Sequence, residues 1–225
     1  MALSPPPNDY QPQQDPNPEF VPLAGEPSPF LPSPGWHAGG GESVSLKGFR
    51  SEADLTQRVL DRLTPWFHVD REVWGRHPTG SRCRIDAIVT PRTPELWKNP
   101  DIALGIEFKA LDTNPHYQSG RKELTAWVAQ AIDYSQVEWP KHGRICTFLC
   151  PDPFADLRKE DGILTDPAAH FAEGLLGQFG VGFLTLYRGT GLSFLLHTNH
   201  TVWSERYGSQ AGRRWTLRRH TGRRH

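Results

Sequence analysis

The sequence predicts an α/β domain built on a mixed β-sheet that is flanked by helices. Segments with a helical spacing of apolar residues and segments with strand-like patterns intermix along the middle of the chain, which is typical of a mixed sheet. This middle part, about 165 residues, is long enough to bury a single core. The chain has no internal repeat that would indicate a solenoid.

Two segments of unusual composition flank this domain, which we place at residues 48–211. The 225 residues carry no formal net charge, but eleven of the 21 prolines lie between Pro5 and Pro34. We interpret residues 1–47 as a disordered, Pro-rich leader, because it has too little apolar surface to offset the chain entropy of folding. Its few apolar side chains dock on a protein partner or on the protein's own domain, or they belong to a loose tail.

Residues 212–225 contain six arginines and no acidic residue. An arm that follows nucleic-acid phosphates is one interpretation of this basic segment, and a solvated tail is the other. The predicted phosphate contacts are four of its arginines: Arg213, Arg214, Arg218 and Arg219.

Composition also excludes several classes of protein. No apolar run approaches the roughly 18 residues of a membrane span, and the first residues lack the pattern of a secretory signal. Three cysteines without a C-x-x-C pair exclude a disulfide scaffold and a zinc finger. A G-x-x-x-x-G-K loop is missing, so we expect no nucleotide cofactor. We therefore expect a cytoplasmic protein with no membrane partner.

A capping signal predicts the first helix, over residues 51–64. Ser51 and Asp54 form an S-x-x-D box at its start, and Pro65 ends the run. The apolar residues between them recur at helical spacing: Leu55, Val59, Leu60 and Leu63.

Three strand patterns follow, over residues 71–77, 82–90 and 102–111. Strict alternation in the second strand predicts one face of Cys83, Ile85, Ala87 and Val89 and another of Arg84, Asp86 and Ile88. In the third strand, alternation predicts a face of Leu104, Ile106, Phe108 and Ala110 and a face of Gly105, Glu107, Lys109 and Leu111.

The rest of the domain continues the intermixed pattern. An amphipathic stripe that ends before Pro140 predicts a long helix over residues 119–138. The apolar run 144–150 predicts a buried strand, and 167–178 predicts a weaker helix. Two last strands, 181–187 and 192–197, surround a glycine-containing turn.

Charged residues stand in two of these apolar strands, where an unpaired charge is costly. Asp86 lies in one, and Glu107 and Lys109 lie two residues apart on one face of the next. If the strands pair as a hairpin, the three side chains converge. Two carboxylates and a backbone carbonyl, that of Phe108, would form an oxygen site for Mg²⁺ or Mn²⁺. Lys109 would orient the attacking water or neutralise charge on phosphate.

This pattern resembles the PD-(D/E)XK nuclease superfamily, whose fold is the restriction-endonuclease-like one. The resemblance covers about residues 51–150, under half of the chain, and includes the order of helices and strands around Asp86 and Glu107-x-Lys109. Ile85 stands where the family name has proline. Gln130 and Tyr134 form a Q-x-x-x-Y motif, which is similar to that of the subset typified by the RecB nuclease and lambda exonuclease. In that subset the two residues lie near the catalytic lysine and the DNA backbone. The alternative is a buried ion network with satisfied core polar groups.

Other residues are candidates for the same site. In similar enzymes a glutamate on the first helix reaches the metal, which makes Glu52 a further candidate ligand; otherwise it is a first-turn acid favoured by the helix dipole. Arg121 and Lys122 begin the long helix, where phosphate binding and a solvated terminus are the two interpretations. Arg84 contacts DNA or pairs with Glu107.

The resemblance implies a metal-dependent deoxyribonuclease with DNA as substrate and Mg²⁺ as cofactor, Mn²⁺ being a substitute. Composition favours a bacterial or phage origin. The alternative is a catalytically silent, DNA-binding or particle-structural protein on the same scaffold. A metal-binding regulator without nuclease activity is a third hypothesis.

Overall fold

The computed structural model describes residues 43–44, 46, 49, 51–97, 99–110, 118–155, 167–187, 191–196, 200–205 and 208–209. Nearly all of the predicted leader and the whole basic arm therefore lie outside the described residues. No described helix has the length and apolar character needed to cross a membrane.

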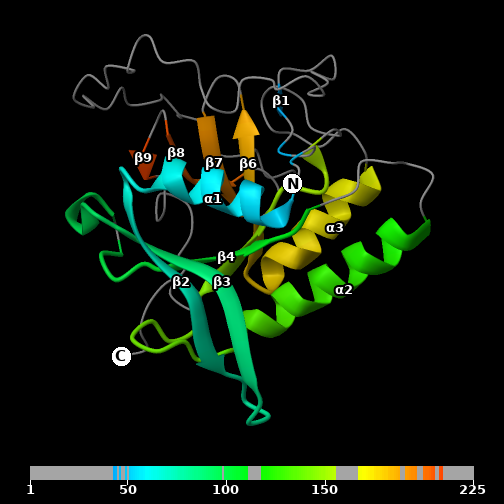
Figure 1. The fold of residues 1–225 in the computed structure, drawn as a ribbon, viewed down its shortest axis with the longest axis horizontal. Helices are drawn as coiled ribbons and strands as arrows, with labels where there is room; N and C mark the ends of the chain where they lie inside the picture. The colour runs from blue at the N-terminus through cyan, green and yellow to red at the C-terminus, as the bar shows by residue number, and fades with distance from the viewer. Residues whose placement is uncertain are drawn as a thin grey trace, which may run out of the picture.

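A nine-stranded mixed sheet forms the centre of the described structure (Figure 1). The strands follow one another in the order β2-β3-β4-β5-β6-β7-β8-β9, and β1 pairs with β6 off this path. The pairs β4–β5 and β5–β6 are parallel, and the other pairs are antiparallel. The mixed α/β class predicted from the sequence is therefore confirmed. The strands are β1 (Ser43–Val44), β2 (Phe67–Arg76), β3 (Arg82–Pro91), β4 (Leu104–Phe108), β5 (Cys146–Cys150), β6 (Val181–Tyr187), β7 (Gly191–Leu196), β8 (His200–Ser204) and β9 (Gly208–Ser209).

Three α-helices cover the two faces of this sheet: α1 (Glu52–Leu63), α2 (Gln118–Tyr134) and α3 (Pro167–Gln178). A short 3₁₀ helix, η1 (Pro94–Leu96), joins β3 to β4. The buried side chains of α1 pack with Leu104 and Ile106 on one face. On the other face, Trp127 of α2 and Leu176 of α3 pack with Leu149 of β5. The adjacent β5 residues Phe148 and Leu149 belong to these two different cores, as strand alternation requires.

The start of α1 confirms the predicted cap. Ser51 lies in extended conformation, and its side-chain oxygen accepts a hydrogen bond of 3.1 Å from the backbone N–H of Asp54. The acidic side chains of Glu52 and Asp54 in the first turn stabilise the helix, because they lie at the positive end of its dipole. The cap therefore fixes the start of α1, whose first turn contains Glu52.

Several predicted boundaries differ from the observed ones. β2 begins at Phe67 instead of residue 71, since its register with β3 extends to the pair Phe67 and Pro91. β4 is shorter than the predicted strand 102–111. α2 ends at Tyr134, four residues early, because the chain turns there so that Glu138 pairs with Arg76 of β2. The sequence patterns do not predict β1, β8 or β9. β1 lies within the predicted leader but pairs with β6, and Leu46 after it is buried in the core, so the folded domain begins earlier than residue 48.

The β2–β3 hairpin changes the core that it faces halfway along its length. Ala87 and Val89 pack in the core beneath α1, whereas Ile85 packs in a second core beside the end of α2. The prediction that these residues share one face with Cys83 is therefore wrong. The change coincides with Glu72 on the partner strand, whose φ of 51° lies in the left-handed region that non-glycine residues rarely adopt. This kink lies between the pairs Arg71–Ala87 and Val73–Ile85, opposite Asp86.

Candidate active site

Pairing of β3 with β4 brings Asp86 and Glu107 together. The two strands are antiparallel, and Ala87 pairs with Ile106. Asp86 and Glu107 are the next residues beyond this pair, and Asp86 acts on Glu107 through its charge and a backbone hydrogen bond. The backbone N–H of Phe108 donates a hydrogen bond of 2.8 Å to Asp86 Oδ2. The convergence expected from a hairpin is therefore present, and one Asp86 oxygen is held by the neighbouring strand.

Glu107 is a buried carboxyl group that lacks a full set of partners. Only 7% of its surface is exposed, and its buried Oε2 has no hydrogen-bond partner among the described residues. Burial, followed by the charge of Asp86, raises the pKa of Glu107 to about 8. A hydrogen bond from the backbone of Asp86 and the charge of Lys109 oppose this rise without cancelling it.

Asp86 is perturbed in the same direction. Burial is the main cause that raises its pKa, and the charge of Glu52 adds to the rise, while the hydrogen bond from Phe108 opposes it. Two acids whose ionised forms are both disfavoured, and one of which raises the pKa of the other, form a site where a cation would be stabilised.

Lys109 lies just beyond the end of β4, where its backbone N–H donates to Cys150 O at 3.0 Å. Its side chain is roughly half exposed, and its Nζ is 4.0 Å from Glu52 Oε2. The structure therefore brings Glu52 to the predicted site, in contact with the lysine. A role of Glu52 as a metal ligand stays a prediction.

Gln130 and Tyr134 form a hydrogen-bonded pair on α2, as their spacing predicts. Gln130 Nε2 donates to the Tyr134 hydroxyl at 2.7 Å, and that hydroxyl donates to Arg84 O at 2.6 Å. Burial, followed by the charge of Glu107, raises the pKa of Tyr134 to about 12. The pair therefore ties α2 to β3 two residues before Asp86, and we assign it a positioning role. A direct catalytic role stays a prediction.

The predicted nucleic-acid contacts are only partly described. Arg84 Nη1 lies 3.4 Å from Glu72 Oε1, so the ion pair seen is with Glu72 and not with Glu107. Arg121 and Lys122 fall in the first turns of α2, but their side chains lie outside the described structure, as does the whole basic arm. Glu72 was missed, and no pattern in the sequence marks its left-handed backbone.

The donors present fit a hard divalent cation. The buried and unpartnered Oε2 of Glu107 beside the Asp86 carboxyl supplies oxygen ligands, and Mg²⁺ keeps several of its waters when few carboxylates hold it. Within the described residues, no group of three or more His, Cys, Asp and Glu side chains is close enough to hold a metal. A metal here would therefore depend on the two acids, backbone carbonyl groups and water. The Phe108 carbonyl stays a predicted ligand.

Comparison of the chain with protein-family models, with curated proteins and with solved structures gave no match. The case for a function therefore depends on the geometry of the residues themselves.

Proposed function

We propose that this protein is a metal-dependent deoxyribonuclease of the PD-(D/E)XK type, with a restriction-endonuclease-like fold, that hydrolyses DNA phosphodiester bonds. The observation that carries the proposal is Glu107, a buried carboxyl group with an unpartnered oxygen, raised pKa and an acidic neighbour in Asp86. Lys109 lies two residues further along the chain, just beyond the end of the same strand, with a half-exposed side chain.

Each residue has a defined part in this proposal. Asp86 and Glu107, with the Phe108 carbonyl, would hold Mg²⁺ or Mn²⁺, which when bound polarises the phosphodiester and acidifies water. Lys109 would orient the attacking water or neutralise charge that develops on the phosphate. Glu52, 4.0 Å from the lysine amine, would keep that amine beside the acids. Gln130 and Tyr134 would hold β3 in position through Arg84 O.

The free-energy cost of the arrangement supports a functional site over a structural ion network. A buried polar atom without a partner destabilises a protein by about 1–3 kcal/mol. In a network built for stability, Lys109 would satisfy the buried carboxyl oxygen. Instead, the ion pair found for Lys109 in the described structure is with the half-exposed Glu52, and Glu107 Oε2 stays unpartnered.

The decisive experiment is a cleavage panel with circular duplex, linear duplex and single-stranded DNA in Mg²⁺ or Mn²⁺. We expect wild-type protein to cleave DNA and Lys109→Ala to lose at least about 10²-fold in rate with its fold intact. Arg58→Ala is the matched control, since it removes an exposed cation from α1 that pairs with Asp54. Resistance of the circular substrate would identify an exonuclease.

Two results would overturn the proposal. Equal inertness of wild type and Lys109→Ala on every substrate would leave no nuclease activity to explain. Salt-dependent DNA binding that survives both EDTA and Lys109→Ala, without cleavage, would instead support a silent DNA-binding scaffold.

A further inference from the structure

The part of the β2–β3 hairpin beyond the Glu72 kink, residues 73–85, carries an exposed aromatic side chain among arginines. We call this part the outer hairpin. Cross-strand register pairs Trp74 with Arg84 and Arg76 with Arg82, and directly paired residues share one face of a hairpin. Trp74 is 48% exposed. The Arg82 guanidinium carbon lies 4.6 Å from its ring centroid, and that of Arg84 lies 5.9 Å away.

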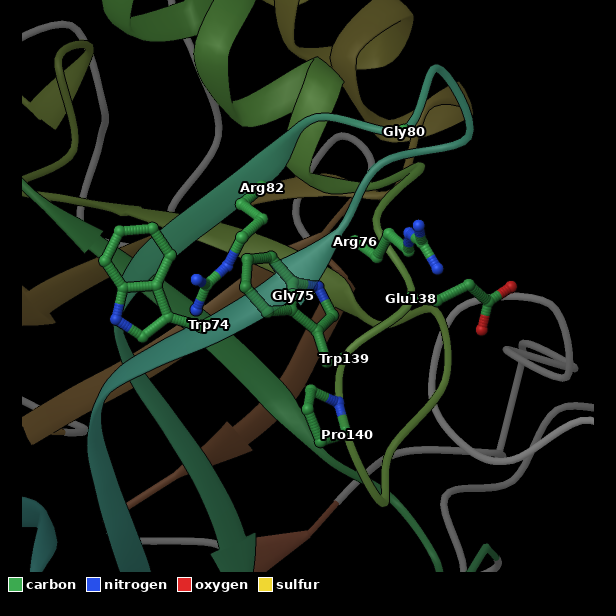
Figure 2. Close-up of a pocket in the computed structure, with 8 residues that line it drawn as sticks. All are labelled: Trp74, Gly75, Arg76, Gly80, Arg82, Glu138, Trp139 and Pro140. Carbon is green, nitrogen blue, oxygen red and sulfur yellow. The ribbon is translucent and has the colours of Figure 1, made fainter.

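A pocket of about 540 Å³ opens beside this tryptophan (Figure 2). The outer hairpin lines it with Trp74, Arg76 and Arg82, and the loop after α2 lines it with Glu138, Trp139 and Pro140. In Figure 2 the Arg82 side chain reaches toward the Trp74 ring. The volume lies within the range of sites that enclose small molecules, so it suffices for a nucleoside.

Packing against the domain fixes the position of the outer hairpin. A Cβ on Gly75 would collide with Val137 Cγ1 and the Trp139 ring, so glycine permits this close approach. The backbones of Arg76 and Glu138 exchange two hydrogen bonds, of 3.0 Å and 2.9 Å. Trp139 also contacts Tyr134 edge to face at a centroid distance of 5.6 Å, so the pocket wall adjoins the candidate active site.

The charges around Trp74 favour a polyanion. Both neighbouring acids have cationic partners, Glu72 with Arg84 and Glu138 with Arg144. Within the described residues, Arg76 and Arg82 form no ion pair. Because a strand rises about 3.3 Å per residue, Arg84 lies about 7 Å and Arg82 about 13 Å along β3 from Asp86. Phosphates of a strand held at Asp86 would therefore reach these arginines.

We propose that the outer hairpin binds single-stranded DNA beside the active site, with an unpaired base stacked against Trp74 and phosphates on Arg76 and Arg82. This inference rests on the proposed nuclease function and names its substrate class. Stacking on an aromatic side chain needs a base whose face is free, which a single strand provides and a base-paired duplex covers. Arginine adds both a stacking surface and a positive charge.

The test measures binding of the full chain to a fluorescein-labelled dT oligonucleotide and to a duplex of equal length, by anisotropy in EDTA. We expect tighter binding of the single strand, and about tenfold weaker binding after Trp74→Ala. Trp74→Phe should recover most of the affinity because it keeps a ring. Phe171→Ala is the matched control, since it removes an exposed aromatic side chain from α3 and should not alter the dissociation constant.

Arg82→Gln should weaken binding and lower the slope of log K against log salt by about one. The inference is overturned if Trp74→Ala binds the single strand as tightly as Phe171→Ala, or if wild type prefers the duplex. Far-UV circular dichroism verifies that each variant is folded.

Turnover separates this inference from the proposed function. Trp74→Ala should raise KM for a single strand while kcat stays near that of wild type. If Lys109→Ala loses cleavage while Trp74→Ala keeps the wild-type KM, the nuclease proposal stands and the proposed DNA binding by the outer hairpin is rejected. If Trp74→Ala weakens DNA binding but the wild-type protein cleaves no substrate, the proposed nuclease function is rejected and the binding of single-stranded DNA by the outer hairpin stands.

Discussion

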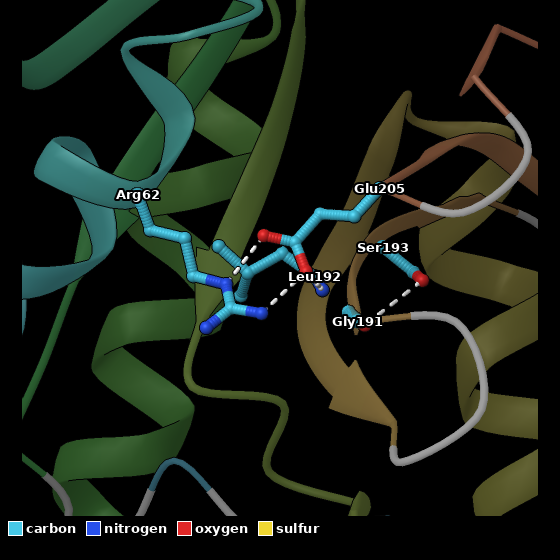
Figure 3. A network of polar contacts seen from close by, with 5 residues as sticks. All are labelled: Arg62, Gly191, Leu192, Ser193 and Glu205. Atoms are coloured by element: carbon cyan, nitrogen blue, oxygen red, sulfur yellow. Dashed lines mark hydrogen bonds and ion pairs between the residues drawn. The ribbon is translucent and has the colours of Figure 1, made fainter. Parts of the chain in front are cut away.

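Glu107 and Glu205 are each 7% exposed, but these two buried carboxyl groups differ in their hydrogen-bond partners. Glu205, after β8, accepts hydrogen bonds on both oxygens (Figure 3). Arg62 of α1 donates from Nε to Oε1 and from Nη2 to Oε2, the latter at 2.7 Å, and the backbone N–H of Leu192 donates to Oε2 at 3.0 Å. Glu107 has an unpartnered oxygen and an acid as its neighbour.

Residues from distant parts of the chain surround Glu205. Arg62 and Glu205 are 143 residues apart in the chain, so their contact ties α1 to the end of β8, which packs in the same core. Gly191, with φ of 69°, leaves the space that Glu205 Oε2 fills, since a Cβ there would overlap that oxygen. Glu205 has hydrogen-bond partners on both oxygens, whereas Oε2 of Glu107 has none among the described residues. We propose that a bound cation is the missing partner of Glu107.

The largest expected effect separates the two glutamates by activity. Glu107→Gln removes a charge that would bind metal, so we expect cleavage to fall at least about 10³-fold, comparable to loss of other transition-state charge stabilisation. Stability at pH 7 should change little, because the raised pKa already keeps the group mostly protonated in the metal-free protein. Glu205→Gln should retain kcat wherever it is folded. If both variants are folded and lose the same activity, the assignment of Glu107 and not Glu205 to the active site is wrong.

The second effect is on pH dependence without metal. Glu107 has an ordinary pKa of 4.5 and a folded-state pKa of about 8, so between these values the native state binds a proton that the unfolded chain has lost. Stability is therefore highest below pH 4.5 for this group and falls as pH rises through 8, by about 5 kcal/mol in total. Urea unfolding in EDTA should show this fall in wild type and a smaller one in Glu107→Gln. If the unfolding free energies of wild type and Glu107→Gln fall equally with pH, the pKa of Glu107 is not raised.

The third effect concerns the satisfied carboxylate. Arg62→Ala leaves Glu205 buried without its cation, so we expect a loss of about 3 kcal/mol in unfolding free energy. Arg58→Ala, on the same helix, breaks an exposed pair with Asp54 and should cost less than about 1 kcal/mol. Urea denaturation measures both. If the two losses are equal, the Arg62–Glu205 contact is not the strong one that its burial indicates.

The smallest effect tests the left-handed backbone at Glu72, which lies opposite Asp86. Glu72→Val should lower stability by about 1 kcal/mol although valine favours strands, because a β-branched residue resists a φ of 51°. Arg71→Val, one position earlier and paired regularly with Ala87, should be tolerated. A stability gain in Glu72→Val would show that the backbone at this position is not left-handed.

Local patterns predicted much of this fold. The cap at Ser51, the α3 helix at 167–178 and the convergence of Asp86 with Glu107 all follow from spacing and alternation within short segments. β2 could have been traced back to Phe67, because Phe67 and Val69 already alternate with polar residues.

Other features depend on partners far away in the chain. The face change between Ile85 and Ala87 coincides with the left-handed backbone of Glu72 on the partner strand, which no residue type in the sequence indicates. The Arg62–Glu205 contact depends on how α1 packs over the sheet, and the early end of α2 depends on the pairing of Glu138 with Arg76. Tertiary packing, and not local preference, determines each of these.

The most direct test of the account is thermal unfolding of the full chain at pH 8 as a function of Mg²⁺ concentration. A ligand that binds only the folded state raises Tm as its concentration exceeds its Kd. We predict a Mg²⁺-dependent rise for wild type and for Glu205→Gln, and none for Asp86→Asn or Glu107→Gln. No rise in wild type, or an equal rise in all four proteins, would contradict the claim that the incomplete carboxyl site binds a metal.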